Sequence, residues 1–250
     1  MKKIFYSIIA IALMGSLGSC NKESLDPTLA QNNAVETSIN TTQDLEGLLY
    51  GAYNRMTSSS YYGRDFIIYG EIRSDNAFSN GNSGRFVTVG SMKLGETEAY
   101  VTNTWSQMYD VIASANIIIN ADNATIDGDV DEINHIKGQA MAMRALAHFD
   151  LVKLYGQQHA GGTLGVPYIK EYKGENLLPS RNTVAEVKTM VLADFDGALA
   201  LMSASMNSSS KQFITTYAVN ALKSRAAIYF EDWAAAKTAA FAVINSEAFE

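Results

Sequence analysis

The stretch DEINHIKGQAMAMRALAHFDLVKLY, from Asp131 to Tyr155, decides the fold. Its apolar side chains recur in steps of three and four residues, which places them on one stripe of a helix, and a second apolar line widens that stripe. A helix that is apolar on more than one side is packed by neighbours on both sides. We therefore predict the central helix of an all-helical protein, roughly 36 Å long at about 1.5 Å per residue. The first line is Ile133, Ile136, Ala140, Met143, Ala147, Leu151 and Leu154, and the second is Met141, Ala145, Phe149 and Val152.

Charged and turn-forming residues mark both ends of this helix. Asp131 and Glu132 place negative charge at the N-terminal end, where the helix dipole is positive. Gly156 stands where a C-terminal cap is expected, and Pro167 follows farther along the chain. These signals support a helix over 131–155.

Helical spacing recurs in five further segments, and these helices can be taken in pairs. The capping signals are Thr42 for the first helix and Thr183, with Glu186 three residues later, for the helix after the central one. The last pair is rich in small residues and tightly joined, as in tetratricopeptide hairpins, although no strict period survives. The predicted pairs are 43–57 with 98–120, 131–155 with 183–203, and 213–230 with 232–245.

Two long excursions separate these helices, over 61–97 and 156–182. The first interleaves aromatic residues with charged residues, amides and glycines, and short strands are possible at Phe66–Tyr69 and Phe86–Val89. Connections this long are uncommon in a compact domain unless they are functional. A helical-repeat fold leaves such insertions on its surface, where binding sites tend to lie.

The bulk composition excludes some partners. The chain has 250 residues, of which 47% are hydrophobic and 18% charged, and a net charge of -7. Removal of a signal segment that contains Lys2 and Lys3 would leave a chain with a net charge of -9. Binding to nucleic acid or to an anionic membrane surface needs clustered Lys and Arg, so we expect neither.

The single cysteine is informative because of its position. A positive start, an apolar run from Ile4 to Gly15 and small residues precede Cys20, which is typical of a cleaved signal. We expect residues 1–19 to be a lipoprotein-type signal, Cys20 to carry the lipid, and 20–41 to be a tether. The alternative is an ordinary secretory signal followed by a chance cysteine. One cysteine allows neither an internal disulfide nor a cysteine-based zinc site.

In order along the chain, several stretches resemble the SusD/RagB family of outer-membrane nutrient-binding lipoproteins, and together they cover nearly the whole sequence. Each stretch is weakly specific alone, and their order makes the resemblance specific. They are Ser19–Cys20, Trp105–Tyr109 with Ile112, Ala115–Asn116, Gly138–Ala140, Arg144–Ala145, Leu154–Gly156, Gly165–Tyr168, Leu178–Val184, Glu186–Val187, Ala193–Asp194, and Ala221–Ala226 running into Trp233.

The resemblance implies an all-α fold of tetratricopeptide-like helix pairs with long irregular insertions. It also implies a lipid-anchored protein at the outer face of the outer membrane, which serves as the lid of a SusC-like TonB-dependent transporter. Such a protein catches oligosaccharides, or sometimes peptides. Family members are usually about twice as long, so residues 42–250 resemble a SusD-like domain truncated at its C-terminus, in a fragment or in a shortened member.

The first excursion supplies the candidate ligand contacts. Stacking of a sugar ring needs an exposed aromatic face with amide, carboxylate or guanidinium groups nearby. The resemblance places ligand contacts on loops after the first helix, where these residue types lie. The alternative is that Asp75 and Asn76 cap a local turn while the aromatic rings pack against the helices. The candidates are Arg73, Asp75, Asn76, Phe78, Arg85 and Phe86.

Other chemically notable residues have structural interpretations. Trp105 and Trp233 lie on apolar helical stripes and are predicted to pack in the core. Arg144 and Arg225 are predicted to form structural ion pairs. Glu132 and His135 have the spacing of half a di-metal site, but no second copy exists, so a solvated helix start is favoured.

We therefore expect no catalytic residues, no metal and no cofactor. The favoured function is capture of a nutrient glycan and its delivery to a transporter, without bond chemistry. One alternative is a helical-repeat scaffold that docks a partner protein. Another is a peptide-binding member that is similar to RagB, and a third is a lipid-anchored hydrolase.

Overall fold

The computed structural model describes residues 38–172 and 178–249. The chain divides into two units, Met1–Ser38 and Ile39–Glu250, and the helices from Thr42 onward belong to the second unit. The predicted signal over 1–19, Cys20 and most of the predicted tether lie outside the described residues. The lipid anchor therefore stays a prediction.

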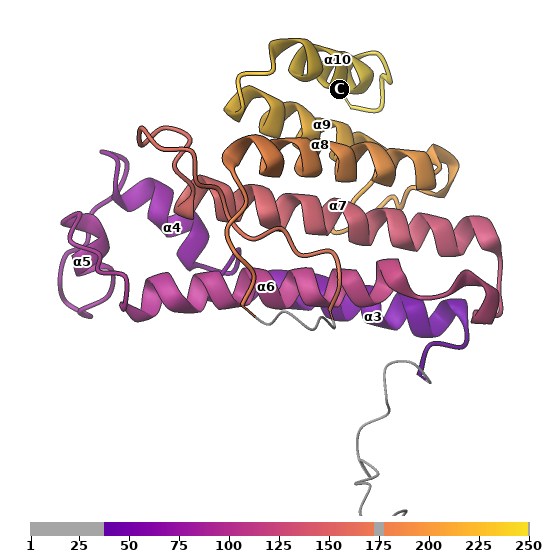
Figure 1. The fold of residues 1–250 in the computed structure, drawn as a ribbon, viewed down its shortest axis with the longest axis horizontal. Helices are drawn as coiled ribbons and strands as arrows, with labels where there is room; N and C mark the ends of the chain where they lie inside the picture. Colours follow the sequence, from indigo (N-terminus) through magenta and orange to yellow (C-terminus); the bar gives the residue numbers. More distant parts are fainter. Residues whose placement is uncertain (1–37, 173–177, 250) are drawn as a thin grey trace, which may run out of the picture. The chain divides into compact units, whose positions relative to one another are not determined.

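The described part is helical, as predicted (Figure 1). It has no strand, and its β-bridges are the isolated pairs Thr41 with Asp127 and Leu164 with Thr183. The elements in order are α3 (Thr42–Met56), α4 (Asp65–Ile72), α5 (Val87–Gly90), α6 (Ala99–Asn120), η3 (Asn123–Thr125), α7 (Val130–Tyr155), α8 (Val184–Leu201), η4 (Ala204–Met206), α9 (Thr216–Tyr229) and α10 (Trp233–Ile244).

The prediction of short strands in the first excursion is wrong. The predicted strand residues fall in α4 and at α5 instead. The buried residues Tyr69 and Ile72 are three positions apart and lie on one side of α4, while Phe86 precedes α5 and Val89 is the buried residue of that helical turn. A short apolar run does not distinguish strand from helix, which explains the error.

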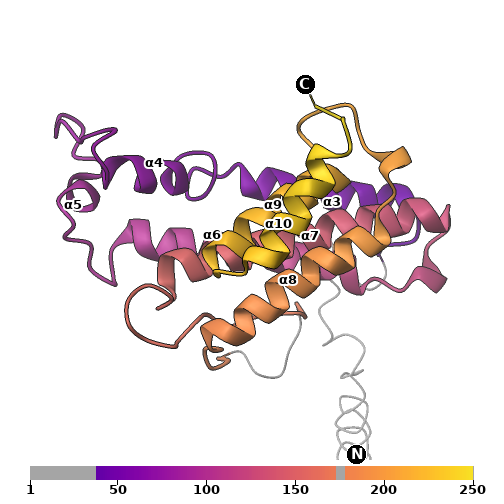
Figure 2. The ribbon, with the colours of Figure 1, turned by 90° about the horizontal axis from the view of Figure 1, so that it is seen from above.

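The helices pack in the pairs that the sequence predicts. α3 packs against α6, α7 against α8, and α9 against α10, while α6 with α7 and α8 with α9 join one pair to the next. Figure 1 shows α6, α7, α8, α9 and α10 as successive layers, and Figure 2 shows the same helices from above. Each pair thus buries part of its apolar surface against the following pair, as in repeat proteins.

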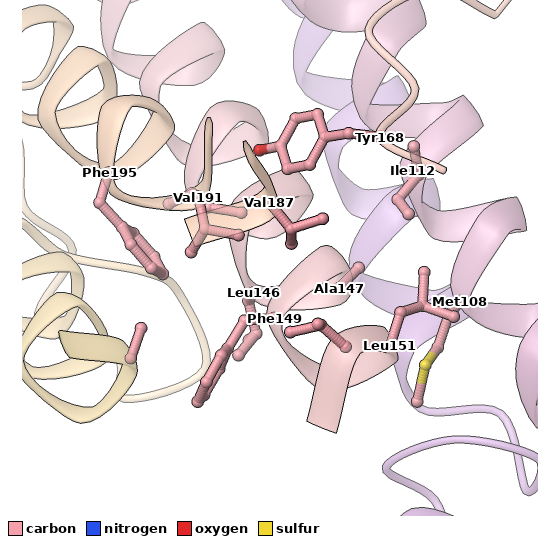
Figure 3. Close-up of a cluster of buried hydrophobic side chains, with 14 of the residues drawn as sticks. Met108, Ile112, Leu146, Ala147, Phe149, Leu151, Tyr168, Val187, Val191 and Phe195 are labelled. Atoms are coloured by element: carbon pink, nitrogen blue, oxygen red, sulfur yellow. The ribbon is translucent and has the colours of Figure 1, made fainter. Parts of the chain in front are cut away.

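Helix α7 is the centre of the core, as its two apolar lines predict. From Ile133 to Val152 every residue is buried except Asn134 and Met141. Figure 3 shows Leu146, Ala147, Phe149 and Leu151 of this helix between side chains from two neighbours. Those side chains are Met108 and Ile112 from α6, and Val187, Val191 and Phe195 from α8.

One glycine lets α7 and α8 approach closely. A Cβ added at Gly138 would lie 2.4 Å from Cγ of Met202 and 2.9 Å from the carbonyl oxygen of Ala198. A side chain at this position would therefore push the backbones of the two helices apart.

The helix ends use the predicted capping chemistry, with one shift. The Thr183 and Glu186 capping box is confirmed, because the Glu186 N–H donates to Thr183 Oγ1 (3.2 Å) and the Thr183 N–H donates to Glu186 Oε2 (2.7 Å). The N-cap of α3 is Thr41 and not Thr42, and Asp44 completes its capping box. Thr42 is buried, and its N–H donates to the carbonyl of Asp127 (3.0 Å).

Candidate functional site

A buried polar network surrounds Arg144, whose predicted structural ion pair is confirmed. Its Nε and Nη2 donate to the two carboxylate oxygens of Asp194 at 2.7 and 2.9 Å, and its Nη1 donates to Asn116 Oδ1 (2.9 Å). The Tyr168 hydroxyl donates to the same carboxylate (2.6 Å). These groups join α6, α7 and α8 to the second excursion, so they stabilise the fold and are not exposed to a ligand.

His148 belongs to this network. Its ring is fully buried and stacks on Tyr168, with 3.8 Å between ring centroids. Nδ1 lies 2.9 Å from the Arg144 carbonyl oxygen, and Nε2 lies 3.0 Å from the backbone nitrogen of Ile169. Because that N–H must donate to Nε2, the imidazole is neutral with its proton on Nδ1. Burial, above all, lowers the pKa of His148 to about 3.

Tyrosine hydroxyls attach the first excursion to the helix pairs. At its start, Tyr61 and Tyr62 donate to Oδ2 of the buried Asp150 at 2.8 and 2.7 Å. Farther on, the Tyr69 hydroxyl lies 3.1 Å from Thr104 Oγ1 and also donates to the Tyr100 carbonyl. Hydrogen bonds from buried hydroxyls hold α4 and the preceding turn against α6 and α7.

Asp150 is unusual among these partners because one of its oxygens is left without a hydrogen bond. Its Oδ1 has no hydrogen-bond partner, and Nζ of Lys153 lies 3.6 Å away. Burial raises the pKa of the Asp150 carboxyl, and the charge of Lys153 opposes that rise.

The predicted ligand contacts lie on the loop after α4, and five of the six are exposed. Phe78 is the most open, with 84% of its surface accessible. The Ser79 hydroxyl donates to the Arg85 carbonyl (2.8 Å), so the loop returns on itself and brings these two positions together. The exposed predicted residues are Arg73, Asp75, Asn76, Phe78 and Arg85.

Local hydrogen bonds hold two of these residues. Nε of Arg73 donates to the Tyr69 carbonyl at the end of α4 (2.8 Å). The Asn76 amide donates to Glu71 Oε2 (2.9 Å), which agrees with the alternative of a turn cap. Within the described residues the Asp75 carboxylate has no hydrogen bond or ion pair.

Phe86 lies apart from the other five because it is buried. Only 6% of its surface is accessible, and its ring stacks on Tyr100 with 4.6 Å between centroids and 21° between planes. The guanidinium of Arg64 lies 5.6 Å from the ring centroid. Phe86 thus supports the loop from beneath and offers no free face for stacking in this conformation.

The structure also tests the sequence interpretations of Trp105, Trp233, Arg225 and His135. Trp105 is half-buried against Tyr109 and Tyr155, in agreement with core packing. Trp233 is 65% exposed, so its predicted core placement is wrong.

The ion pair predicted for Arg225 is wrong. Arg225 forms no ion pair within the described residues, and its guanidinium instead lies 6.0 Å from the ring centroid of Phe149. His135 is buried and not solvated, because η4 and the residues around it cover that part of α7.

The structure adds a feature that the sequence did not indicate, a groove of about 760 Å³ between the end of α3, α7, α9 and the segment before α9. Tyr53, Tyr62 and Phe213 supply aromatic rings to its lining, and Asn54 and Arg225 supply polar groups. The Tyr53 hydroxyl donates to Gln139 Oε1 (2.8 Å) and accepts from the Ile214 N–H (2.7 Å). These residues come from distant parts of the sequence, so no local motif reveals the groove.

Within the described ranges no helix has the length and apolarity that crossing a bilayer requires. The same ranges contain no group of three or more His, Cys, Asp or Glu residues arranged to hold a metal ion.

Comparison with known proteins gives one consistent result. A family model described as SusD-like, "Starch-binding associating with outer membrane", matches residues 25–229. The SusD-like protein P2 of Formosa agariphila is 31% identical over 171 residues, which are 68% of this chain and 31% of that protein. The chain therefore spans about a third of that relative's length.

Solved structures agree in fold. A putative sugar binding protein of Bacteroides vulgatus superposes with a TM-score of 0.73 and 30% identity, over 84% of this chain and 47% of that one. A SusD superfamily protein of Bacteroides thetaiotaomicron gives a TM-score of 0.72 and 28% identity, over 82% and 46%. The helix pairs, their insertions and these matches together show that the chain belongs to the SusD-like family.

Proposed function

We propose that this protein captures an oligosaccharide at the cell surface and passes it to a SusC-like TonB-dependent transporter, without making or breaking bonds. Membership of a family described as starch-binding and associating with the outer membrane carries the proposal. The name of the solved Bacteroides vulgatus relative, a putative sugar binding protein, supports it. In this proposal residues 1–19 are the signal, lipidated Cys20 anchors the chain, 20–41 form the tether, and 42–250 are the SusD-like domain.

The loop over 73–85 is the proposed contact surface. Phe78 offers an open aromatic face, and the Asp75 carboxylate has unused acceptor capacity. Arg73 and Arg85 are exposed donors nearby in the sequence. An aromatic face surrounded by charged hydrogen-bonding groups suits the apolar face and the hydroxyls of a sugar. Because Phe86 and Tyr69 are buried beneath the loop, the loop has a firm base.

Isothermal titration calorimetry against a panel of glycans tests this function. We expect one glycan class to bind, and we expect Phe78→Ala and Asp75→Ala each to weaken binding about tenfold, which is about 1.4 kcal/mol. Trp233→Ala is the matched control, because it removes another exposed aromatic ring from a distant helix. Unchanged affinity in both loop variants would remove these residues from the site.

A second candidate function is a scaffold that docks a partner protein, and the outer face of α10 favours it. Trp233, Phe241 and Ile244 of this helix are 65%, 47% and 66% exposed, which is a large apolar surface for one helix. The same glycan panel separates the candidates, because a pure scaffold binds no glycan. Binding of peptides alone would instead favour the RagB-like alternative.

A further inference from the structure

A second cavity, of about 210 Å³, lies between α3, α7 and the segment after η4. We name it the His135 cavity, lined among others by Glu46, Tyr50, Glu132, His135, Gln139 and Phe213. Its volume exceeds the roughly 30 Å³ that one water occupies in the liquid. It is smaller than the roughly 300 Å³ at which pockets for drug-sized ligands begin. The space therefore suits one small ring.

Two buried polar side chains of α7 line this cavity with unused donors. Gln139 is 8% exposed, and its Oε1 is held by the Tyr53 hydroxyl at 2.8 Å, which turns the amide nitrogen away from that contact. Within the described residues that nitrogen has no hydrogen-bond partner. The nitrogen is not enclosed by protein, so it can be reached from the cavity and can donate to an acceptor there.

His135 supplies the second donor. It is 6% exposed, and its Nδ1 accepts a hydrogen bond from the Ser203 N–H at 3.3 Å. In the neutral imidazole the proton then lies on Nε2, which becomes a donor. Burial lowers the pKa of His135, so the ring is neutral at pH 7.

Acceptors and an aromatic face complete the lining. Glu46 and Glu132 are exposed carboxylates, and the Tyr50 hydroxyl donates to Glu46 and fixes it. The Tyr50 ring is 46% exposed and packs against Phe213, with 5.6 Å between centroids. Donors, acceptors and an aromatic face thus converge on one small space.

The chemistry of this lining selects a ligand class. A neutral sugar ring has hydroxyls that both donate and accept, together with an apolar face that packs on an aromatic ring. Two carboxylates disfavour a phosphate or an acidic sugar by like-charge repulsion. We propose that the His135 cavity binds one neutral pyranose unit, as a subsite separate from the loop over 73–85.

This inference rests on the proposed function, since it assumes a glycan ligand, but it concerns other residues. Nuclear magnetic resonance of the three histidine imidazoles tests it directly, with the purified protein titrated by neutral methyl glycosides of glucose, galactose and mannose. His135 lines the cavity, whereas His148 is buried in the core and His159 is exposed elsewhere. We expect at least one glycoside to shift the His135 signals saturably and to leave the other two in place.

Variants at the rim provide the control. Glu132→Ala should raise the dissociation constant about tenfold, by removing a charged acceptor. Asp131→Ala removes the neighbouring carboxylate of the same helix turn, which does not line the cavity, and should leave the constant unchanged. Equal effects of the two variants would overturn the proposal. So would His135 signals that respond to no glycoside, or that respond more strongly to methylammonium.

The two proposals fail in different ways. If oligosaccharides bind and Phe78→Ala abolishes binding while His135 never responds, the subsite is overturned and the proposed function stands. If His135 responds to a glycoside and loop variants change nothing, the cavity is supported and the loop is not the contact surface. If no glycan binds to either place, both proposals are overturned.

Discussion

Replacement of His148 by Gln should remove a specific part of the protein's sensitivity to acid. His148 is completely buried, and a protonated ring could not accept the Ile169 N–H that it accepts now. Glutamine offers an amide N–H donor and a carbonyl acceptor on a side chain of similar length, but it does not titrate. The substitution therefore separates protonation from the hydrogen bonds of this position.

The size of the stability loss on acidification follows from the pKa of His148, which burial lowers to about 3 from an unperturbed 6.5. Because the folded-state pKa lies below the unfolded one, the unfolded chain binds the proton first as the pH falls. The stability from the neutral ring is fully present above pH 6.5 and is lost progressively between about pH 6.5 and 3. One pKa unit corresponds to about 1.4 kcal/mol, so acidification from pH 7.5 to 4.5 should cost about 2–3 kcal/mol through this residue.

Urea unfolding followed by circular dichroism measures this free energy at the two pH values. His159→Gln is the matched control, because His159 is an exposed histidine with no part in the Arg144 network. The parent and this control should each lose about 2–3 kcal/mol more than His148→Gln on acidification. Carboxylates titrate equally in all three proteins, so their contribution cancels. An equal loss in all three proteins would refute the neutral, buried state assigned to His148.

Three further predictions concern stability and are measured by the same unfolding experiment. Arg144→Met should lower the free energy of unfolding by about 3–5 kcal/mol, because it leaves Asp194 charged and buried. The double variant with Asp194→Leu should recover most of that loss, and no recovery would contradict this account. Phe195→Ala should cost about 3–5 kcal/mol, whereas Trp233→Ala should stay within about 1 kcal/mol, and equal losses would contradict their assigned burial. Thr183→Ala should cost about 1 kcal/mol by removing a cap, and an unchanged midpoint would argue against the capping box.

The helices could be predicted from the sequence because their apolar residues repeat with the period of the structure. The stripe from Ile133 to Leu151 is buried, and Thr183 with Glu186 caps α8, as local chemistry requires. The pairing followed from the same periodicity and from the short connection between the last two helices.

Burial of single residues could not be predicted in this way. Trp233 lies on an apolar stripe, yet exposure depends on whether another element covers that stripe, which spacing alone does not encode. Likewise His135 is covered by residues near Ser203, far along the chain. A short apolar run such as Phe86–Val89 has too few residues to reveal its period, so its helical turn was missed.

The exposure of the loop that carries Phe78 was predictable, because its residue types differ from those of the helices around it. The role of this loop as a ligand contact stays a prediction. The groove beside Phe213 and the His135 cavity were not found, because each draws its lining from α3, α7 and the segment before α9. Convergence of this kind is a property of the folded chain and has no local signature.

The tyrosine attachments of the first excursion have an evolutionary consequence. Tyr61, Tyr62 and Tyr69 hold that segment to the helix pairs before the exposed loop begins at Arg73. Mutations, insertions and deletions over 73–85 therefore fall outside the contacts that maintain the scaffold. Lineages that share these tyrosines can therefore vary the length and sequence of the loop while the helix pairs keep their packing.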